Sequence, residues 1–265
     1  MKAYNLSNKF RIQILKMSNK TGAPHVASAF SCLDIVTTLY NSILKVFPKN
    51  PKNPNRDRFI LSKGHAATAQ YVNLAEKGFF SKNYLKSYTN TNSFLEEHPN
   101  PSIKGVEAAT GSLGHGLPIG CGIALAGKIK KKNFKTVVVL GDGECNEGSV
   151  WEAALFASSK NLNNLHVIID NNGWQGIGRN EDILNLSPLK KKWESFGWKT
   201  YVINGHNENE LKKIFKLKQK NKPTVIIAKT IKGKGVSFME DDNNWHYRIP
   251  TKKEILIAQK ELKIK

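Results

Sequence analysis

Apolar runs and polar stretches follow one another between residues 137 and 178 in an order that predicts a strand, a helix and a second strand. Residues 137–140 and 167–169 are continuously apolar, and each run ends abruptly in polar residues and glycine. Between the two runs, apolar residues recur at helical spacing from Trp151 onward. Strands without alternation are typical of a parallel sheet that is covered on both faces. The pattern therefore predicts a three-layer α/β fold with a mostly parallel sheet.

The rest of the chain gives the other elements of this fold. Helices are expected over residues 5–17, 31–44, 66–77, 82–88, 117–129, 188–193, 208–216 and 252–262, and strands over 58–61, 198–203 and 223–229. Loops are expected over residues 179–188 and 240–248. No internal repeat or low-complexity linker divides the sequence, so residues 1–265 are predicted to form a single domain.

Polar side chains follow both central strands. Asp142 lies between Gly141 and Gly143 after the first strand, and Asn172 follows the second strand about thirty residues later. In a right-handed βαβ unit both strand ends open on one edge of the sheet, where ligands bind. The glycines let the backbone approach a bulky anion. A carboxylate, an amide oxygen and a backbone carbonyl suit Mg²⁺, so a magnesium-bridged diphosphate is predicted here.

A second glycine-rich turn, residues 110–116, precedes the predicted helix 117–129. The free N–H groups at a helix N-terminus form a ready anion site. We expect the diphosphate to lie between this turn and residues 141–143.

The charge of the chain is strongly positive, with 41 Lys and Arg against 21 Asp and Glu. Only five of the basic residues are Arg, and the lysines are scattered along the sequence. Nucleic-acid sites usually rely on Arg and cluster their charge, so no nucleic-acid partner is expected. The positive field would still attract anionic substrates such as sugar phosphates.

The three cysteines, odd in number, indicate no disulfide framework, and Cys145 is interpreted as a loop residue. No apolar run approaches the length of a membrane span, and the first residues lack the apolar region of a signal peptide. No membrane partner and a cytoplasmic location are therefore expected.

The strand-end motif resembles the thiamine diphosphate signature, which begins with Gly-Asp-Gly and ends in Asn about thirty residues later. Over nearly the whole chain the sequence resembles the N-terminal, diphosphate-binding part of transketolase, in the form that is a separate subunit. The stretches that carry this resemblance are His25 with Asp34, residues 56–65, 105–107, 110–116, 141–148, 196–198 and 229–235, and Trp245-His246.

This resemblance implies thiamine diphosphate and Mg²⁺ as cofactors and assigns residues to both. Asp142, Asn172 and the carbonyl of Trp174 would be the metal ligands. The implied cofactor-binding residues are these three with Gly111, Ser112, Leu113, Gly114, His115, Gly141, Gly143 and Glu147. His115 stands where the family commonly has Gln. An acidic residue at the position of Glu147 lies near the subunit interface in the family. Alternatively, Glu147 is simply a carboxylate at the start of a helix, where the helix dipole favours negative charge.

The resemblance also implies that several histidines point into a substrate channel, where they bind sugar hydroxyls and handle protons. By motif they are His25, His65, His98 and His246. Imidazole suits this task because it titrates near neutral pH and can donate or accept. Lys232 and Lys234 would lie close to the channel, either holding phosphate or solvated. His166 is expected in a strand and His206 at the surface.

Two departures from the family pattern affect the expected shape of the site. Pro24 precedes His25 where the family commonly has Gly, and Tyr247 stands where Gly commonly follows the Trp-His pair. A larger side chain at residue 247 would narrow the sugar site, which makes an unusual substrate possible.

By this resemblance the chain transfers a two-carbon ketol unit from a ketose phosphate to an aldose phosphate, in the pentose phosphate route or a specialised sugar pathway. In the family a second domain supplies the glutamate that protonates the cofactor's pyrimidine ring, and this chain shows no second long α/β pattern for it. Activity is therefore expected only with a C-terminal partner subunit that carries the pyrimidine-binding domain, in an α2β2 assembly.

Two alternatives stay open at the level of the sequence. The α-type subunit of a 2-oxo acid dehydrogenase would fit Trp151-Glu152-Ala153 and Asn171-Asn172, but it does not account for residues 62–65 or Trp245-His246. A basic nucleic-acid-binding protein would fit the charge, but the sequence has no recognisable motif for that function.

Overall fold

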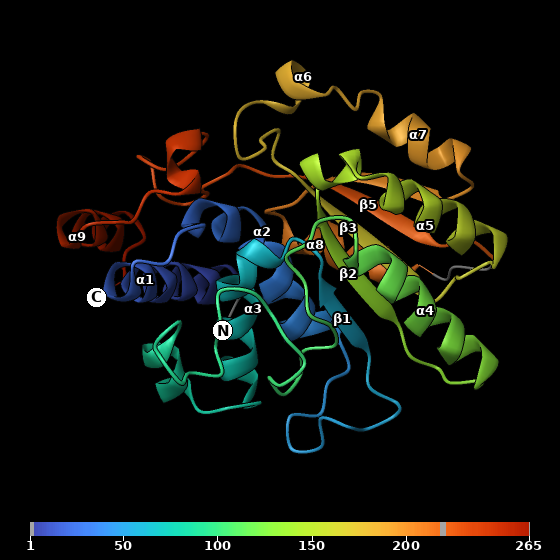
Figure 1. The fold of residues 1–265 in the computed structure, drawn as a ribbon, viewed down its shortest axis with the longest axis horizontal. Helices are drawn as coiled ribbons and strands as arrows, with labels where there is room; N and C mark the ends of the chain where they lie inside the picture. Colours follow the sequence, from blue (N-terminus) through green and yellow to red (C-terminus); the bar gives the residue numbers. More distant parts are fainter. Residues whose placement is uncertain (1–2, 218–220, 265) are drawn as a thin grey trace.

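A five-stranded parallel sheet forms the centre of the molecule in the computed structural model, which describes residues 3–217 and 221–264 (Figure 1). The strand order is β1-β2-β3-β5-β4, and every neighbouring pair is parallel. The strands are β1 Arg58–Leu61, β2 Thr136–Gly141, β3 Leu165–Asn171, β4 Lys199–Asn204 and β5 Thr224–Lys229. The predicted three-layer α/β fold with a parallel sheet is confirmed.

Helices cover both faces of the sheet because successive side chains of the buried strands point to opposite sides. On one face, Val137 and Val139 pack with the cluster that includes α1 Ala3–Thr21, α2 Val26–Thr38, α3 Ala67–Lys77, α8 Glu208–Lys216 and α9 Lys252–Glu261. On the other face, Val138 and Leu140 pack against α4 Gly116–Ile129, α5 Gly148–Ser159 and α7 Leu189–Ser195. These two apolar layers explain why the strands show no polar alternation in the sequence.

Helix α2 is the most deeply buried helix of the first face, since each of its thirteen residues is buried. It continues into a π-helical turn, Leu39–Ile43. Contrary to the expectation from the sequence, residues 26–43 reach the length and mean hydropathy of a membrane span, the one such stretch within residues 3–217 and 221–264. However, 83% of this stretch is buried inside the protein, as in the core helix of a folded domain.

Most predicted elements lie within a few residues of those observed, and the differences have local causes. Helix α2 begins at Val26, five residues before its predicted start, and Ser31 lies buried within it and bonds Asp170. The predicted loop 179–188 contains a short helix, α6 Asn180–Ile183, whose first turn carries two acidic residues that favour a helix start. Helical 3₁₀ turns cover Gly64–Ala66, Lys82–Ser87, Gly143–Asn146 and Asn243–His246.

The placement of His206 at the surface was wrong, whereas His166 lies in the core. His206 Nδ1 lies 2.7 Å from Asp34 Oδ2, and the Ile231 N–H donates to His206 Nε2 at 3.0 Å. Asp34 also pairs with Arg11 at 2.8 Å, so His206 belongs to a network between α1, α2 and the turn after β4. His166 is buried in β3 with its ring stacked on Phe215 at 4.9 Å between centroids.

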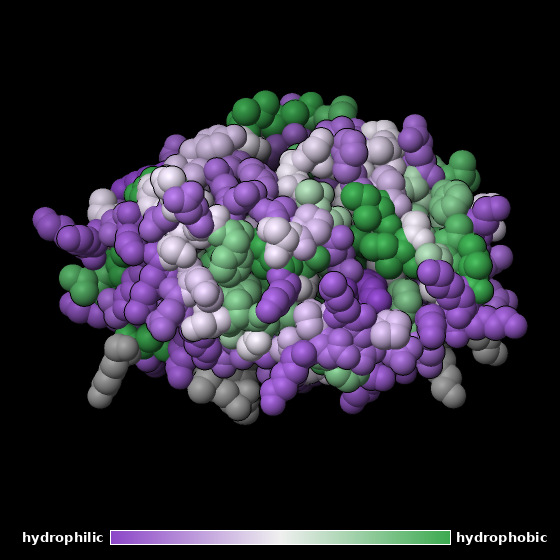
Figure 2. Space-filling model, turned by 60° about the horizontal axis from the view of Figure 1, so that its bottom comes forward, coloured by the Kyte–Doolittle hydropathy of each residue, from purple (hydrophilic) through white to green (hydrophobic). Residues whose placement is uncertain are grey.

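The outer surface is mainly hydrophilic in the view of Figure 2, with hydrophobic side chains gathered in small patches between polar ones. Exposed apolar side chains also occur on α4 and α5, where Ile129 is 72% exposed and Leu155 is 61% exposed. The surface of α4 and α5 therefore combines polar side chains with exposed apolar ones.

Close packing of α4 on the sheet depends on Gly120. A Cβ at this position would lie 2.6 Å from Val138 Cγ2, whereas a Cβ at Gly122 on the same helix would meet nothing within 4 Å. We expect Gly120→Ala to lower the free energy of unfolding by about 1–3 kcal/mol through overpacking.

The matched control is Gly122→Ala, which should raise the free energy of unfolding by about 0.5–1 kcal/mol because alanine favours a helix over glycine. Urea denaturation of both variants measures the difference. Equal stabilisation by the two substitutions would contradict the close contact between α4 and β2.

Candidate active site

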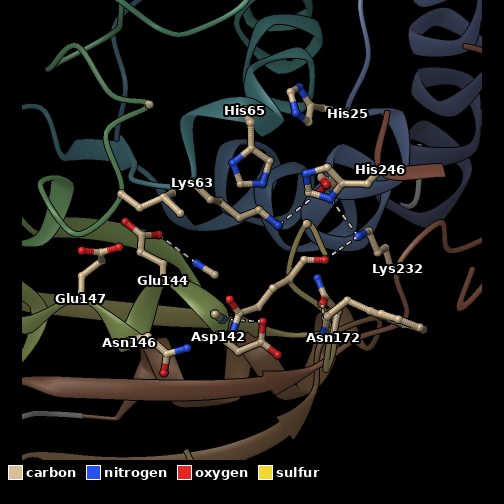
Figure 3. A pocket seen from close by; sticks show the side chains of 18 of the residues that line it. His25, Lys63, His65, Asp142, Glu144, Asn146, Glu147, Asn172, Lys232 and His246 are labelled. Carbon is tan, nitrogen blue, oxygen red and sulfur yellow. Dashed lines mark hydrogen bonds between the residues drawn. The ribbon is translucent and has the colours of Figure 1, made fainter. Parts of the chain in front are cut away.

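A pocket of about 390 Å³ opens at the carboxyl edge of the sheet (Figure 3). Histidines lie on one side of it, and the acidic and amide side chains that follow the strands lie on the other. Twelve of the predicted site residues line it: His25, His65, His98, Gly111, Leu113, Gly141, Asp142, Gly143, Glu147, Asn172, Trp174 and His246. One cavity thus collects predicted site residues from seven separate stretches of the chain.

Three residues predicted to contact the cofactor do not line this pocket: Ser112, Gly114 and His115. His115 is exposed, and its Nδ1 lies 3.0 Å from the Leu113 carbonyl oxygen. Gly114 is buried and serves the turn instead, since its N–H donates to Glu144 and its carbonyl accepts from Ser149 Oγ at 3.0 Å. The turn thus faces the pocket through Gly111 and Leu113.

Asp142 lies against the turn that follows β3, as the parallel register of β2 and β3 requires. Its Oδ2 accepts a hydrogen bond from the Gly173 N–H at 2.6 Å, and its Oδ1 accepts one from the Gly143 N–H at 2.9 Å. The residue is only 2% exposed. Burial raises the pKa of Asp142 to about 6 despite these two hydrogen bonds.

The amide of Asn172 is oriented by its neighbours. Its Nδ2 donates to Ser31 Oγ at 3.0 Å, and its Oδ1 accepts from the Trp174 N–H at 2.9 Å. Ser31 Oγ in turn donates to the carboxylate of Asp170 at 2.6 Å. The fully buried Asp170 therefore lies behind Asn172 and helps to fix the direction of its side chain.

Asp170 forms a buried ion pair with Lys63, which lies two residues after the end of β1. Burial acts to lower the pKa of Lys63, but Asp170, together with Cys32 and Asp142, acts in the opposite direction, and the net result is a raised pKa. Thr230 Oγ1 also donates to Asp170. Neither member of this pair was predicted from the sequence, although both lie just beyond the apolar runs of β1 and β3, which is the signal that identified Asp142.

The donor set fits a cation that prefers oxygen ligands. Within residues 3–217 and 221–264, Asp142 has no ion pair with a basic side chain, so its buried charge is not neutralised by contact. The same described residues contain no cluster of three or more His, Cys, Asp or Glu that could hold a metal. The carboxylate of Asp142, the amide oxygen of Asn172 and the backbone carbonyl of Trp174 would hold such a metal, because oxygen ligands suit a hard divalent ion.

The carboxylate of Glu144 joins the segments around the pocket. It accepts a hydrogen bond from Ser62 Oγ, from the Gly114 N–H at 2.9 Å and from the Gly141 N–H at 3.0 Å. These donors belong to the end of β1, the glycine-rich turn and the end of β2. Burial raises the pKa of Glu144, and the three hydrogen bonds act in the opposite direction. This residue was also missed, because nothing in the sequence distinguishes it from other residues of its turn.

Three histidine rings form a cluster over the pocket. The ring centroids of His25 and His246 are 5.1 Å apart, those of His25 and His65 are 5.4 Å apart, and those of His65 and His246 are 5.9 Å apart. Tyr247 packs edge-on against His246 at 4.5 Å, so the tyrosine narrows the mouth on this side. Burial is the largest cause that lowers the pKa of His65 well below its usual value and the pKa of His246 to about 3.

His98 reaches the pocket past Gly111. This glycine has a φ of 139°, and a Cβ there would lie 2.7 Å from His98 Cδ2. Glycine at residue 111 therefore satisfies both the backbone conformation and the close approach of the imidazole.

Lys232 lines the pocket and is only 1% exposed, so it is not a solvated lysine. Its Nζ lies 2.9 Å from His246 Nδ1 and donates to Asn243 Oδ1 at 2.5 Å. Burial lowers the pKa of Lys232 to about 8. Lys234 instead pairs with Glu240 at 3.0 Å, and Glu147 is exposed at the start of α5.

The model of one protein family, described as the transketolase thiamine diphosphate binding domain, matches residues 3–264. A fold and strand-end pocket of this kind define a thiamine diphosphate-binding α/β domain. The chain belongs to the transketolase family and corresponds to its thiamine diphosphate-binding domain.

Its similarity to known proteins extends over nearly the whole chain. It is 39% identical to a protein of Phocaeicola vulgatus that is named as a subunit of apulose-4-phosphate transketolase, over 97% of this chain and 92% of the relative. It is 41% identical to the protein of the same name from Actinobacillus succinogenes over 96% of this chain and 92% of that relative. The crystal structure of Campylobacter jejuni transketolase superposes with a TM-score of 0.94 at 30% identity.

These similarities decide between the hypotheses from the sequence. This chain is covered completely by the Campylobacter transketolase but spans only 43% of that chain, and it spans 38% of human transketolase at 39% identity. It thus corresponds to the N-terminal portion of a transketolase that other organisms divide between subunits. The 2-oxo acid dehydrogenase and nucleic-acid-binding alternatives are not favoured.

The raised pKa of Asp142 predicts a pH-dependent effect on stability. Burial raises this pKa from the usual 3.8 to about 6, so the folded protein holds the proton more tightly than the unfolded chain. Ionisation of Asp142 therefore lowers the free energy of unfolding as the pH rises from about 4 through 6. In metal-free protein at pH 7.5, we expect Asp142→Asn to raise the free energy of unfolding by on the order of 1–3 kcal/mol.

The increase in the free energy of unfolding caused by Asp142→Asn should shrink toward pH 4, where the Asp142 carboxyl is protonated in the folded wild type. Urea denaturation at both pH values measures it, and the exposed Asp182→Asn serves as the control for loss of one charge. A variant Asp142→Asn that is less stable than the wild type at pH 7.5 would show that the buried carboxylate is compensated within the chain.

Proposed function

We propose that this chain is the thiamine diphosphate-binding subunit of a two-subunit transketolase that transfers a two-carbon ketol unit from a ketose phosphate to an aldose phosphate. The observation that carries this proposal is the joining of Asp142 and Asn172 with a histidine cluster in one pocket of a transketolase-family domain. Ketol transfer requires one pocket that binds both the metal with its diphosphate and the hydroxyl groups of the sugar.

The cation would be Mg²⁺, held by Asp142, Asn172 and the carbonyl of Trp174 and shared with the diphosphate. Gly111, Leu113, Gly141 and Gly143 would receive the diphosphate, since they line the pocket beside these ligands. When bound, thiamine diphosphate supplies the electron sink that stabilises the carbanion formed as the sugar carbon–carbon bond breaks. The network behind Asn172 keeps the amide oxygen in place for the cation.

The histidines would bind and deprotonate the sugar. Because burial lowers the pKa of His25, His65 and His246, these rings are neutral at pH 7 and can each donate one hydrogen bond and accept another. His98 would complete the ring of hydroxyl contacts from the side of the glycine-rich turn. Lys232 would add positive charge near the sugar phosphate.

A partner subunit would complete the active site. Both relatives that match over nearly their full length are named as one subunit of a transketolase, and the solved transketolases of the family are more than twice as long. The partner would supply the pyrimidine-binding domain and its glutamate. An α2β2 assembly is supported by exposed apolar side chains on α4 and α5, among them Ile119, Leu155 and Phe156.

Two relatives carry the name apulose-4-phosphate transketolase, so a specialised sugar phosphate is a candidate substrate for this chain as well. Tyr247 supports a substrate with particular spatial demands, because it packs on His246 at the mouth of the pocket. Apulose 4-phosphate and the ordinary pentose phosphate ketoses should therefore be compared side by side.

Co-expression with the product of an adjacent reading frame that encodes the pyrimidine-binding domain tests the proposal. We expect ketol transfer with thiamine diphosphate and Mg²⁺ only when both chains are present. Asp142→Ala should reduce activity roughly 10²-fold or more and weaken Mg²⁺-dependent cofactor binding measured by calorimetry, since a metal ligand is lost.

Asp182→Ala removes an exposed carboxylate from α6 and should stay within about twofold of the wild type in the same assays. Ketol transfer by this chain without a partner, or undiminished cofactor binding by Asp142→Ala, would refute the corresponding part of the proposal.

A further inference from the structure

Two of the clustered histidines have hydrogen-bond partners of opposite kinds. His25 Nδ1 lies 3.1 Å from Glu97 Oε1, and His246 Nδ1 lies 2.9 Å from Lys232 Nζ. A carboxylate can only accept a hydrogen bond, whereas an ammonium group can only donate one. The two imidazoles therefore face the same pocket under opposite constraints.

These partners determine where the proton of each neutral ring lies. Neutral imidazole has one N–H and one acceptor nitrogen. Against Glu97, His25 carries its proton on Nδ1 and presents Nε2 as an acceptor. Against Lys232, His246 accepts at Nδ1 and carries its proton on Nε2. Two rings whose centroids are 5.1 Å apart thus offer complementary functions to the pocket.

Both rings are held firmly in these orientations. His25 precedes α2 with a φ of 69°, a conformation that is unusual for a residue other than glycine, and its N–H donates to the His246 carbonyl oxygen at 3.1 Å. Lys232 is fixed by His246, as Figure 3 shows, and also donates to Asn243 Oδ1. His246 Nε2 lies close to Gly176, 3.4 Å from the place where a Cβ of that residue would lie, and both residues line the pocket.

We propose that Glu97 and Lys232 set His25 and His246 in opposite tautomers, which makes His25 the proton acceptor for the substrate hydroxyl and His246 a hydrogen-bond donor to the sugar. This inference rests on the proposed ketol transfer. It assigns Glu97 as a positioning residue, a role that the sequence did not indicate.

In the proposed reaction His25 takes up one proton and later returns it. The substrate O–H bond breaks, its proton passes to His25 Nε2, and its electrons form the carbonyl of the departing aldose. The electrons of the broken carbon–carbon bond remain with the two-carbon unit. When the new bond forms, the acceptor's carbonyl oxygen becomes a hydroxyl by taking the proton back from His25. The Glu97 carboxylate stabilises the imidazolium that exists in between.

The charged and titratable groups that face His25 come from several elements. Glu97 acts to raise its pKa, His98 and Lys232 act to lower it, and the rings of His65, His246 and Tyr247 pack against it. Glu97 is the one carboxylate paired with His25 among the described residues. Its removal should therefore shift the titration of His25 toward lower pH.

Tautomers can be read by NMR from the ring ¹³C and ¹⁵N shifts of histidine-labelled full-length chain, without partner or cofactor. His25→Gln and His246→Gln variants assign the two resonances. We expect wild-type His25 in the Nδ1–H form and His246 in the Nε2–H form. Glu97→Ala should give a mixture of forms at His25, and Glu97→Gln should keep the Nδ1–H form because its amide oxygen still accepts.

Activity of the two-subunit enzyme gives an independent readout. Glu97→Ala should lower kcat roughly tenfold with little change in KM, and Glu97→Gln should move the acidic limb of the pH profile of kcat/KM to lower pH. Glu96→Ala is the matched control, since this neighbouring carboxylate is exposed and bonds Asn100 instead. It should leave both the tautomers and the pH profile unchanged.

Wild-type His25 in the Nε2–H form, or a tautomer that does not respond to Glu97→Ala, would overturn the inference even in an active enzyme. Expected tautomers in an enzyme that catalyses no ketol transfer would instead overturn the proton-transfer role together with the proposed function. The two failures are thus distinguishable.

Discussion

The ion pair between Lys63 and Asp170 is the interaction on which the site depends most. It connects the end of β1 to β3 in the interior, and through Ser31 it reaches α2 and the amide of Asn172. Breaking a buried pair leaves an uncompensated charge, which is far more unfavourable than losing a surface pair. The geometry at the strand ends is therefore tied to the core of the protein. Glu144 ties the glycine-rich turn to the same edge by neutral donors.

The fold was largely predictable because its strands carry a simple signal. Residues 137–140 are apolar on both faces, and the structure places helices on both sides of them. Elements with polar residues in the interior were harder to predict: α2 was expected to begin at Ser31, whereas it begins at Val26 and Ser31 bonds Asp170 in the interior. His206 was placed at the surface because it follows the Asn204-Gly205 turn, and its partner Asp34 lies far away in the sequence.

The site was predictable where the residues stand directly at strand ends or within family motifs. The position of Asp142 against the turn of Asn172 follows from the parallel register alone. Glu97, Glu144 and Asp170 could not be assigned in this way, because their importance comes from partners on other segments. His115 shows the opposite case, since it stands inside a motif but is turned toward solvent. Sequence position identifies the turn, whereas only packing identifies which side chains face inward.

The two buried aspartates at the strand ends have a consequence for how the site fills. Lys63 balances Asp170, while Asp142 has no such contact among residues 3–217 and 221–264. An anionic ligand approaching the empty pocket meets this uncompensated charge, and a dication removes the repulsion. Each ligand should therefore tighten the affinity for the other by the same factor, as thermodynamic reciprocity demands. The pocket would therefore bind the anionic ligand and the dication together, and it would seldom hold only one of them.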